Sequence, residues 1–522
     1  MTWSQHAALA RIEQHRKSVP ETAITVEDYT AFVDTRLRSI ELAKSLGQTS
    51  EPIWRIGRNR AVTTHGVHVY ANLIDFNATL VDAGRETEAS HERAMQLLHL
   101  HYGACDALIA AFDIQRVDFH GGRLHAVVLS PAGAAGEATR IEKALAFSAA
   151  LIQMVARASE RYGSEFRTGV RIGIDSGPAV AINSGSRGEP DPLFIGSPAN
   201  HAAHLACGDE PGVFVSARAE RARSLGAAFA SEPVRLRDDV VTAALDRSVE
   251  VRGTFLGGRN RLEEAFSRFV DDRDALKAAS GGLRPASFVF HYRQPPLRTI
   301  DFADHPPSRS IRMPVVSVFA DLAGYTAYVD QAIQTGKVAE AVANLYIVRS
   351  ELTDVLQKDF DGRKVRYIGD CLHGLIAEGD ARSTDEKRSV KAAVFAASGI
   401  RSSFNLCRQI LPGLAGLEGI AIGLELGWTP MCRIGLTGEA SVRCSTSKAT
   451  CLSESLQGDC NGRQTALGDR ALREADAKVR YLFGPLQRVD NLDHVTAVAQ
   501  LDGVSSAAVI RSQDHMEAHC KP

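Results

Sequence analysis

Apolar side chains recur along this chain in a succession of helical and strand-like periods that occurs twice. In the first half, residues Val26–Ser45 follow helical spacing, and the apolar run His65–Ile74 that comes after them predicts a strand. The same periodicities then predict, in order, a helix at Glu86–Phe112, two strands within Gln115–Val128, a helix at Arg140–Tyr162, a strand at Thr168–Gly177 and a helix at Ala199–Ala206.

The second half repeats this order. The pattern there predicts a strand and turn at Ser317–Asp330, a helix at Val338–Lys358, two strands within Lys364–Ile376, a helix at Thr384–Cys407, a strand at Gly419–Gly427 and a helix at Ser447–Leu456. Each half thus has the β-α-β-β-α-β order of a ferredoxin-like unit. We therefore predict an α+β fold with two tandem ferredoxin-like domains. Two unrelated α/β domains of coincidentally similar order are the alternative.

Composition and element order together place the domain boundaries. Residues 1–55 are predicted to be a helical lead-in, residues 56–270 the first domain and residues 311–510 the second. Between the domains, residues 271–310 are polar and contain several Pro and Gly residues, which is typical of a linker.

The bulk properties are those of an ordinary globular protein. The 522 residues are enough for two or three domains, and 44% of them are apolar and 23% charged. A formal net charge of -2 gives no basic field for nucleic acid or an anionic membrane. No apolar run reaches the ~18–20 residues that cross a bilayer, and the N-terminus lacks a signal-peptide core, so we expect a cytoplasmic protein. The nine cysteines lack CxxC pairs and are expected to be free thiols.

Several segments resemble one protein family in the right order. Val318–Thr326 resembles the opening strand and loop of class III adenylyl and guanylyl cyclases, and Val365–Leu375 resembles the hairpin that holds their metal ions. In the first half, Val170–Ala206 and Glu210–Ser216 resemble the family's stretch around its transition-state helix. The resemblance implies attack of a ribose 3′ oxygen on the α-phosphate of a nucleoside triphosphate, with release of pyrophosphate. It also implies that the two halves pair as an intramolecular pseudo-heterodimer.

The second half has the metal-binding residues that the resemblance implies. Two divalent cations, Mn²⁺ or Mg²⁺, are expected at Asp321, Leu322 and Asp370, because these hard ions prefer carboxylate and carbonyl oxygens. The turn at Leu322, Gly324, Tyr325 and Thr326 is expected to offer backbone N–H groups to the phosphates. A helix N-cap role for Asp321 and a turn role for Asp370 are the structural alternatives.

The first half lacks these groups but has the other part of the set. Asn72 aligns with Asp321 and Gly122 with Asp370, so no metal is expected there, and the displaced Asp75 has little weight. The resemblance implies that Asn200 steadies the ribose and that His204, where the family has Arg, stabilises the reacting phosphate. Their spacing of four residues places both on one helical face. In the second half, the corresponding residues are approximately Ala449 and Ser453, with Lys448 nearby, which can do neither task. His201 and His125 are alternative phosphate contacts.

The positions that read the base in purine cyclases correspond to Asp118 and Leu193, which match neither purine code. A carboxylate at Asp118 can accept from uracil N3–H or the cytosine amino group, while Leu193, with Phe119 and Phe194 nearby, narrows the pocket. This pair resembles the pyrimidine cyclases of the bacterial Pycsar antiphage systems. The implied product is cyclic UMP or cyclic CMP, a messenger read by a separate effector. UTP is preferred over CTP because N3–H suits an ionised Asp118.

Two other functions remain open from the sequence. One is a purine cyclase of ordinary signalling with a divergent base pocket, which nucleotide competition would reveal. The other is a catalytically dead pair that only binds nucleotide or a partner protein, which His204 in place of Arg favours. Since one chain already pairs its halves, a monomer is permitted. No nucleic-acid or membrane partner is expected.

Overall fold

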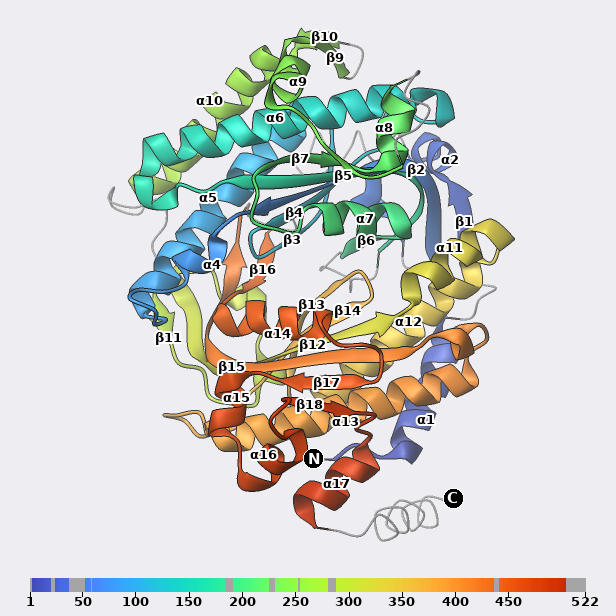
Figure 1. Cartoon of the computed structure of the whole chain (residues 1–522), viewed down its shortest axis with the longest axis vertical. Coiled ribbons are helices and arrows are strands. Elements are labelled where there is room, and N and C mark those ends of the chain that lie inside the picture. The colour runs from blue at the N-terminus through green and yellow to red at the C-terminus, as the bar shows by residue number, and fades with distance from the viewer. Residues whose placement is uncertain are drawn as a thin grey trace.

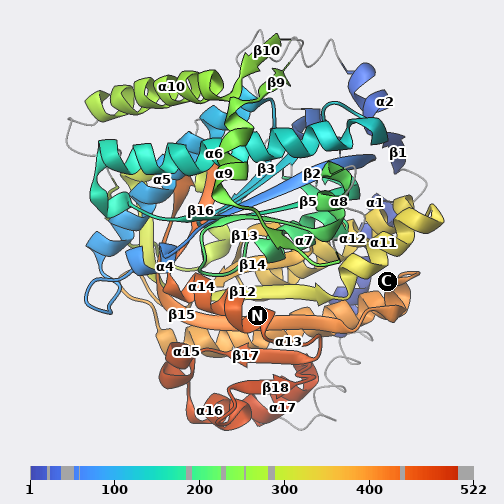
Figure 2. The same cartoon turned by 45° about the horizontal axis from the view of Figure 1, so that its top comes forward.

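The computed structural model describes residues 2–19, 24–36, 52–57, 59–183, 191–224, 231–251, 254–279, 288–435 and 441–503. Figures 1 and 2 show two α+β domains, one above the other, whose sheets lie at the centre of the molecule with long helices on their outer faces. Among the described residues, none of the helices combines the length and the apolar character that a bilayer-spanning helix needs.

The first domain contains an eight-stranded sheet with the path order β3-β4-β2-β5-β7-β8, to which β1 and β6 add at β2 and β5. Its strands are β1 (Thr25–Asp28), β2 (Arg60–Leu73), β3 (Gln115–His120), β4 (Arg123–Val128), β5 (Val170–Asn183), β6 (Pro192–Ile195), β7 (Gly212–Val215) and β8 (Val234–Arg235), with a separate two-stranded ribbon of β9 (Ser248–Val251) and β10 (Thr254–Gly257). Its helices are α2 (Tyr29–Asp34), α4 (Phe76–Thr79), α5 (Glu88–Phe112), α6 (Glu137–Tyr162), α7 (Ser197–Leu205), α8 (Ala217–Arg223), α9 (Asp238–Ala243) and α10 (Gly258–Ala279).

The second domain repeats that sheet as β13-β14-β12-β15-β17-β18, with β11 added at β12 and β16 at β15. Its strands are β11 (Phe290–His291), β12 (Ser310–Ala323), β13 (Arg363–Ile368), β14 (Cys371–Ile376), β15 (Gly419–Ile434), β16 (Val442–Ser445), β17 (Gln464–Leu467) and β18 (Arg488–Asp490). Its helices are α11 (Tyr325–Thr335), α12 (Val338–Asp354), α13 (Glu386–Ile410), α14 (Lys448–Gly458), α15 (Asp469–Glu474), α16 (Ala477–Phe483) and α17 (His494–Asp502), together with α1 (Gln5–Ser18) from the N-terminus. The predicted tandem ferredoxin-like architecture is confirmed.

Strand register makes the repeat regular enough to match residues one by one. Tyr70 lies opposite His125 on β4 and Gly173 on β5, and Phe319 lies in the same way opposite His373 and Gly423. The two aromatic–histidine pairs even stack alike, with ring centroids 4.2 Å and 4.4 Å apart. Tyr70 and Phe319 are therefore equivalent positions, and residues counted along the same strands from them can be matched between domains.

The two domains exchange β-hairpins. Ile182 and Leu193, from the β5–β6 hairpin of the first domain, are buried in the core of the second domain. Reciprocally, Ile434 and Val442, from the β15–β16 hairpin, are buried in the core of the first domain. Because each core is completed by the other domain, the halves form one packed unit, as the predicted pseudo-heterodimer requires.

The N-terminal segment differs from the sequence expectation. The predicted helix at Val26–Ser45 begins as strand β1, which pairs in parallel with β2, and it is helical only over α2; residues 37–50 lie outside the described part of the chain. Helix α1 instead packs on the second domain, where Trp3 donates to Ser403 at 2.8 Å and Arg11 pairs with the buried Glu351. The N-terminal segment therefore contacts both domains.

The segment 271–310, predicted to be a linker, contains regular structure at both ends. Helix α10 extends through it to Ala279, and β11 pairs in parallel with the first residues of β12 at Ser310 and Ile311. The pairing of β11 with β12 mirrors that of β1 with β2. The Pro and Gly content of this segment thus indicated that a linker joins the two domains, but it did not give the residues at which the linker begins and ends.

Candidate active site

A cavity of about 520 Å³ lies between the two domains. The second domain lines it with the end of β12, the start of α11 and the β13–β14 turn, and the first domain lines it with β3, β6 and α7. The residues predicted to bind the metal ions and the phosphates, to orient the ribose and to read the base all line it: Asp118, Leu193, Asn200, His204, Asp321, Leu322, Gly324, Tyr325, Thr326 and Asp370.

Asp321 and Asp370 face this cavity from neighbouring strands, because β12 and β14 are paired and Asp370 lies in the turn before β14. Burial raises the pKa of Asp321 to about 6. Burial, and then the charge of Asp321, raises the pKa of Asp370 well above its usual range. When both are ionised, these two buried carboxylates repel each other. A divalent cation bound between them would offset that repulsion.

The turn after β12 opens directly into helix α11. Gly324, with φ +85°, is the N-cap of this helix, and a residue with a Cβ would be strained there. Tyr325 is buried at the first turn, while Thr326 accepts a hydrogen bond from the Asn200 side-chain amide of the first domain. The free N–H groups at the start of α11 therefore lie beside both Asp321 and Asn200.

Helix α7 is held against the second domain at its N-terminus. The Ser197 N–H donates to the Asp330 carboxylate of α11 over 2.9 Å. Asp330 thus caps α7 from across the domain boundary, three residues before Asn200, and together with Thr326 fixes where the Asn200 side chain lies. His204, one turn further on, is exposed toward the cavity.

The other two histidines have structural partners. His201 contacts the fully buried Asp175, with Nδ1 and Oδ2 3.2 Å apart. His125 stacks on Tyr70 and shares a hydrogen bond of 3.1 Å with His68, and burial lowers its pKa well below the usual range. A neutral, already paired His125 is a poor phosphate ligand, although its ring lines the cavity.

Asp118 faces the cavity but is also paired across the domains. Both of its carboxylate oxygens accept from Nη1 of Arg366, over 2.8 Å and 3.0 Å, and 28% of its side chain stays exposed. Burial raises the pKa of Asp118 and the Arg366 charge opposes that rise. Leu193 and Phe194 are buried against the cavity, whereas Phe119 points to the opposite face and stacks on Tyr102.

The equivalent region of the first domain has a different surface. Register from Tyr70 places Asn72 at the position of Asp321 and Gly122 at that of Asp370. Asp75 corresponds to Gly324, with the same left-handed backbone (φ +59°) and the same N-cap position on a helix, here α4. α4 has four residues where α11 has eleven, and Phe76 is buried beside Gly122. Asp75 thus occupies the N-cap position of α4 without a capping hydrogen bond from its side chain, and it lines a different cavity from Asp321 and Asp370.

Packing under the two helices corrects one alignment. Gly173 lies beneath Ala202 and Ala206 of α7, and its equivalent Gly423 lies beneath Ser453 and Gln457 of α14. The helix residues of the two domains are therefore 251 positions apart, the difference between 202 and 453. Asn200 and His204 correspond to Cys451 and Ser455, not to the predicted Ala449 and Ser453. The conclusion that the second domain lacks both groups is unchanged.

Three titratable residues of the cavity were missed from the sequence. Glu454 of α14 accepts from Arg123 over 2.6 Å and contacts His120 at 3.2 Å, and all three line the cavity. Burial raises the pKa of Glu454, but its contacts with His120 and Arg123 outweigh burial and hold that pKa far below its usual range. The available signal was a basic residue on each side of the Gly121–Gly122 turn, the hairpin tip at which the other domain has Asp370.

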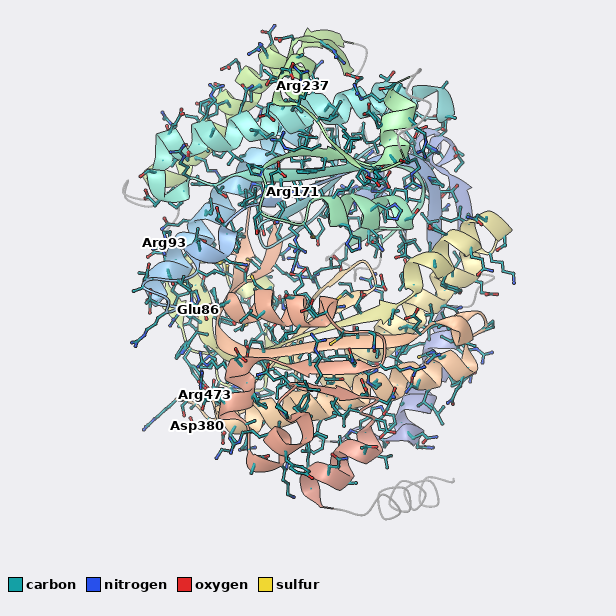
Figure 3. All side chains as sticks on the ribbon, viewed as in Figure 1. Glu86, Arg93, Arg171, Arg237, Asp380 and Arg473 are labelled. Carbon is teal, nitrogen blue, oxygen red and sulfur yellow. The ribbon has the colours of Figure 1, made fainter. Side chains whose placement is uncertain are left out.

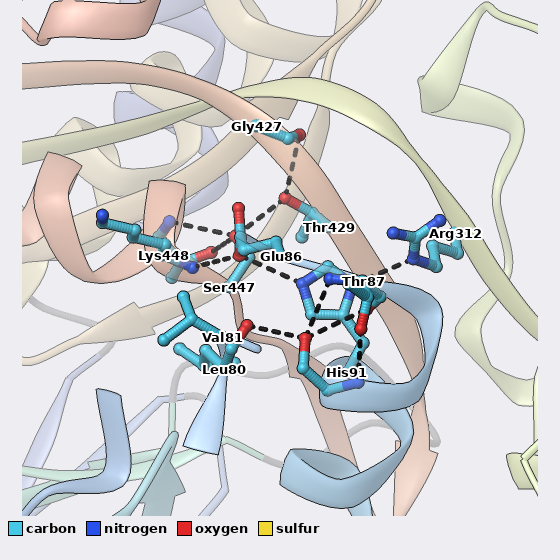
Figure 4. Close-up of polar contacts among 12 residues, drawn as sticks. Leu80, Val81, Glu86, Thr87, His91, Arg312, Gly427, Thr429, Ser447 and Lys448 are labelled. Atoms are coloured by element: carbon cyan, nitrogen blue, oxygen red, sulfur yellow. Dashed lines mark hydrogen bonds and ion pairs between the residues drawn. The ribbon is translucent and has the colours of Figure 1, made fainter. Parts of the chain in front are cut away.

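A second cluster of polar contacts ties the far side of the domain boundary, where Figures 3 and 4 label Glu86. Its carboxylate accepts from the Lys448 N–H of α14 over 2.7 Å and contacts His91 at 3.0 Å. The other His91 ring nitrogen accepts from Arg312 Nε at 2.9 Å. Glu86 thus caps α14 from the first domain as Asp330 caps α7 from the second.

The donor set suits hard cations but is small. Among the described residues, no group of three or more His, Cys, Asp or Glu side chains forms a metal cluster. The two carboxylates with the adjoining main chain at Leu322 offer oxygen donors, which fits Mg²⁺ or Mn²⁺ better than Zn²⁺. A larger cavity of about 920 Å³ on the outer side of the first domain contains Asp75 but no other residue selected from the sequence.

Similar proteins cover nearly the whole chain. A uridylate cyclase from a Rhizobium species is 46% identical over 496 residues, 92% of each chain. A uridylate cyclase from Pseudomonas aeruginosa is 34% identical over 98% of this chain and 94% of its own length. The crystal structure of a class III adenylyl cyclase-like ATP-binding protein from Pseudomonas aeruginosa matches with a TM-score of 0.83 and 32% identity, over 96% of this chain and 100% of its own. No protein-family model matches the sequence.

Proposed function

The chain belongs to the same family as these two uridylate cyclases, and on that premise we propose that it converts UTP to 3′,5′-cyclic UMP and pyrophosphate. The observation that carries this proposal is the shared cavity, which brings Asp321 and Asp370 of one domain within reach of the same small molecule as Asn200 and His204 of the other. Neither domain contains both sets.

Asp321 and Asp370, with the Leu322 carbonyl, would hold two divalent cations. When bound, the ions favour the deprotonated 3′ oxygen and neutralise the triphosphate. The raised carboxyl pKa values support this assignment, because the pair gains most from a positive charge placed between its members. The N–H groups of the α11 start, exposed by the sharp turn at Gly324, would bind the outer phosphates.

Helix α7 would orient the reacting end of the nucleotide. The Asn200 amide, already held near Asp321 by Thr326, would hydrogen-bond the ribose so that its 3′ oxygen faces the α-phosphate. His204, when protonated, would donate to the α-phosphate oxygens as negative charge accumulates there. These two roles differ in kind: Asn200 sets geometry and His204 supplies charge.

Asp118 and Leu193 would read the base. One Asp118 oxygen can accept from uracil N3–H while both oxygens keep their contact with Arg366, since a carboxylate has about four acceptor sites. The Arg366 charge favours the ionised form that this acceptor role needs. Leu193 and Phe194 would close the apolar side of a pocket sized for one ring.

The test is incubation with UTP, CTP, ATP and GTP in turn, and then with all four together, in the presence of Mn²⁺ or Mg²⁺. Mass spectrometry identifies the cyclic products. We expect cyclic UMP as the main product of the mixture. Dominant cyclic AMP would favour adenylate cyclisation, the second candidate, which the description of the solved relative as ATP-binding supports.

A messenger role for the product is a further part of the proposal. If the product is a messenger, a separate effector protein must bind it. The sequence resemblance implies that this signalling takes place in antiphage defence. Cells carrying the Asp321→Asn variant should lose any phage resistance that the active chain provides together with its effector.

A further inference from the structure

The two residues that meet at the centre of the domain boundary occupy the same position in each repeat. Asp118 lies opposite His125, and Arg366 lies opposite His373, and both strand pairs have their irregularity one step earlier, at Arg116/Asp118 and Lys364/Arg366. His125 and His373 are themselves equivalent. Asp118 and Arg366 therefore occupy equivalent positions in the two domains, and their side chains are of opposite charge type.

These equivalent residues contact each other directly. Arg366 Nη1 donates to both Asp118 oxygens, and the guanidinium also donates to the main-chain carbonyls of Phe119 and Arg443. Its side chain is only 6% exposed. Equivalent positions of two related domains touch only where the axis that relates them passes, so this ion pair marks the axis.

A second group of interdomain contacts near the cavity also joins residues whose equivalents in the other domain are different. Arg123 and His120 belong to the first domain and Glu454 to the second. Register and helix packing match these three residues with Cys371, Ile368 and Ala203. None of those counterparts is charged. Each ionic contact therefore takes one member from each kind of domain and has no copy related by the axis.

We infer that these contacts are a recognition code that allows only unlike domains to pair. Two first domains docked in this way would place Asp118 against Asp118 and would leave Arg123 facing alanine. Two second domains would place Arg366 against Arg366 and would leave Glu454 facing cysteine. Both arrangements bury unpaired or like charges, whereas the unlike pair satisfies every one. The partner that this surface fits is the other domain of the chain, so each chain forms a single composite cavity.

The experiment is a charge-reversal cycle in the full-length chain: Asp118→Arg, Arg366→Asp and the double variant. It measures the thermal unfolding midpoint and, by light scattering, the mass in solution, so its outcome is independent of catalysis and of the proposed function. Each single reversal should lower the midpoint by about 5 °C or more, and the double reversal should recover at least half of the combined loss. The wild-type chain should remain at 56.3 kDa at every concentration.

A matched control lies inside the first domain. Arg259 near the start of α10 and Asp246 in the turn before β9 form an ion pair whose side chains are 56% and 55% exposed, and reversing it should shift the midpoint by no more than about 1 °C. If the reversed Asp118 and Arg366 variants fold too poorly to measure, Asp118→Asn, Arg366→Gln and their combination provide the same cycle. Losses that simply add in the double variant, by either route, would overturn the code.

Discussion

The two domains share one sheet topology but contribute different residues to the cavity between them. At the end of the first strand of each sheet, the second domain has Asp321 and the first has Asn72, and at the helix cap three residues later Gly324 contrasts with Asp75. The second domain continues into the eleven-residue α11, whose first turn lines the shared cavity, and the first continues into the four-residue α4, whose Phe76 packs beside Gly122. Equivalent positions in a duplicated fold thus share geometry without sharing function.

The interdomain caps of α7 and α14, by contrast, are present on both sides. Asp330 caps α7 and Glu86 caps α14, each from across the boundary and over 2.9 Å and 2.7 Å. On the proposed function, the Asp330 cap near Asn200 would serve catalysis and assembly, and the Glu86 cap near Cys451 would serve assembly alone. Variants at matched positions can separate those tasks.

The largest difference is expected at the metal positions. Asp321→Asn or Asp370→Asn should lower kcat for UTP cyclisation by ~10³-fold or more, because the carboxylate oxygens that hold the cations are lost. Asn72→Asp, the matched change in the first domain, should leave kcat within about twofold. A comparable loss of kcat in Asn72→Asp would mean that both positions contribute to catalysis. The comparison is made from steady-state kcat values measured with Mn²⁺.

Asn200 should come next. Asn200→Ala removes the group proposed to orient the ribose and should lower kcat by ~10²-fold with a smaller change in KM. The equivalent residue, Cys451 of α14, packs against the core of the first domain and is not among the residues that line the shared cavity, so Cys451→Ala should retain most of the activity. Equal losses at both positions would show that α7 and α14 contribute through stability alone.

The two caps should differ by about tenfold in their effect on kcat. Asp330→Ala frees the N-terminus of α7 and should lower kcat by ~10-fold, while Asp330→Asn, which keeps an acceptor oxygen, should restore most of it. Glu86→Ala should destabilise the chain to a similar degree without lowering kcat of the folded fraction. A kcat that falls equally in both variants would remove the distinction between the caps.

The smallest effect concerns stability and its pH dependence. Because burial raises the pKa of Asp321 to about 6, the metal-free folded chain holds that proton more tightly than the unfolded chain does. Stability is therefore lost as pH rises from about 4 through 6. Asp321→Asn avoids this loss and should be more stable than the wild type by about 3 kcal/mol at pH 8 in EDTA, with the gap closing near pH 4. Denaturant unfolding at both pH values measures it, and a gap that widens toward low pH would contradict the assignment.

Sequence periodicity was sufficient for the fold and for most of the cavity, because strand spacing is regular. Counting along β2 and β12 correctly matched Asn72 with Asp321, and the hairpins matched Gly122 with Asp370. Counting failed on α14, where a loop of a different length precedes the helix, so its phase is set by Gly423 packing beneath it and not by spacing. The matched residues moved from Ala449 and Ser453 to Cys451 and Ser455.

Contacts between the domains were beyond the reach of the sequence. Asp118 was selected for its place in the strand, but its partner Arg366 is 248 residues away. Likewise, Glu454 and Arg123 are distant in sequence and acquire their role only when the two sheets face each other. Pairing of charges across a duplicated fold depends on the relative placement of its halves, which spacing within each half does not contain.

A crystal structure with Mn²⁺ and 3′-deoxy-UTP, which lacks the attacking oxygen, tests the central claim most directly. The account predicts metal ions on Asp321 and Asp370 of the second domain and, in the same nucleotide, a ribose within hydrogen-bond distance of Asn200 and a uracil ring beside Asp118 of the first. A nucleotide bound by residues of one domain alone, or placed outside the shared cavity, would contradict it.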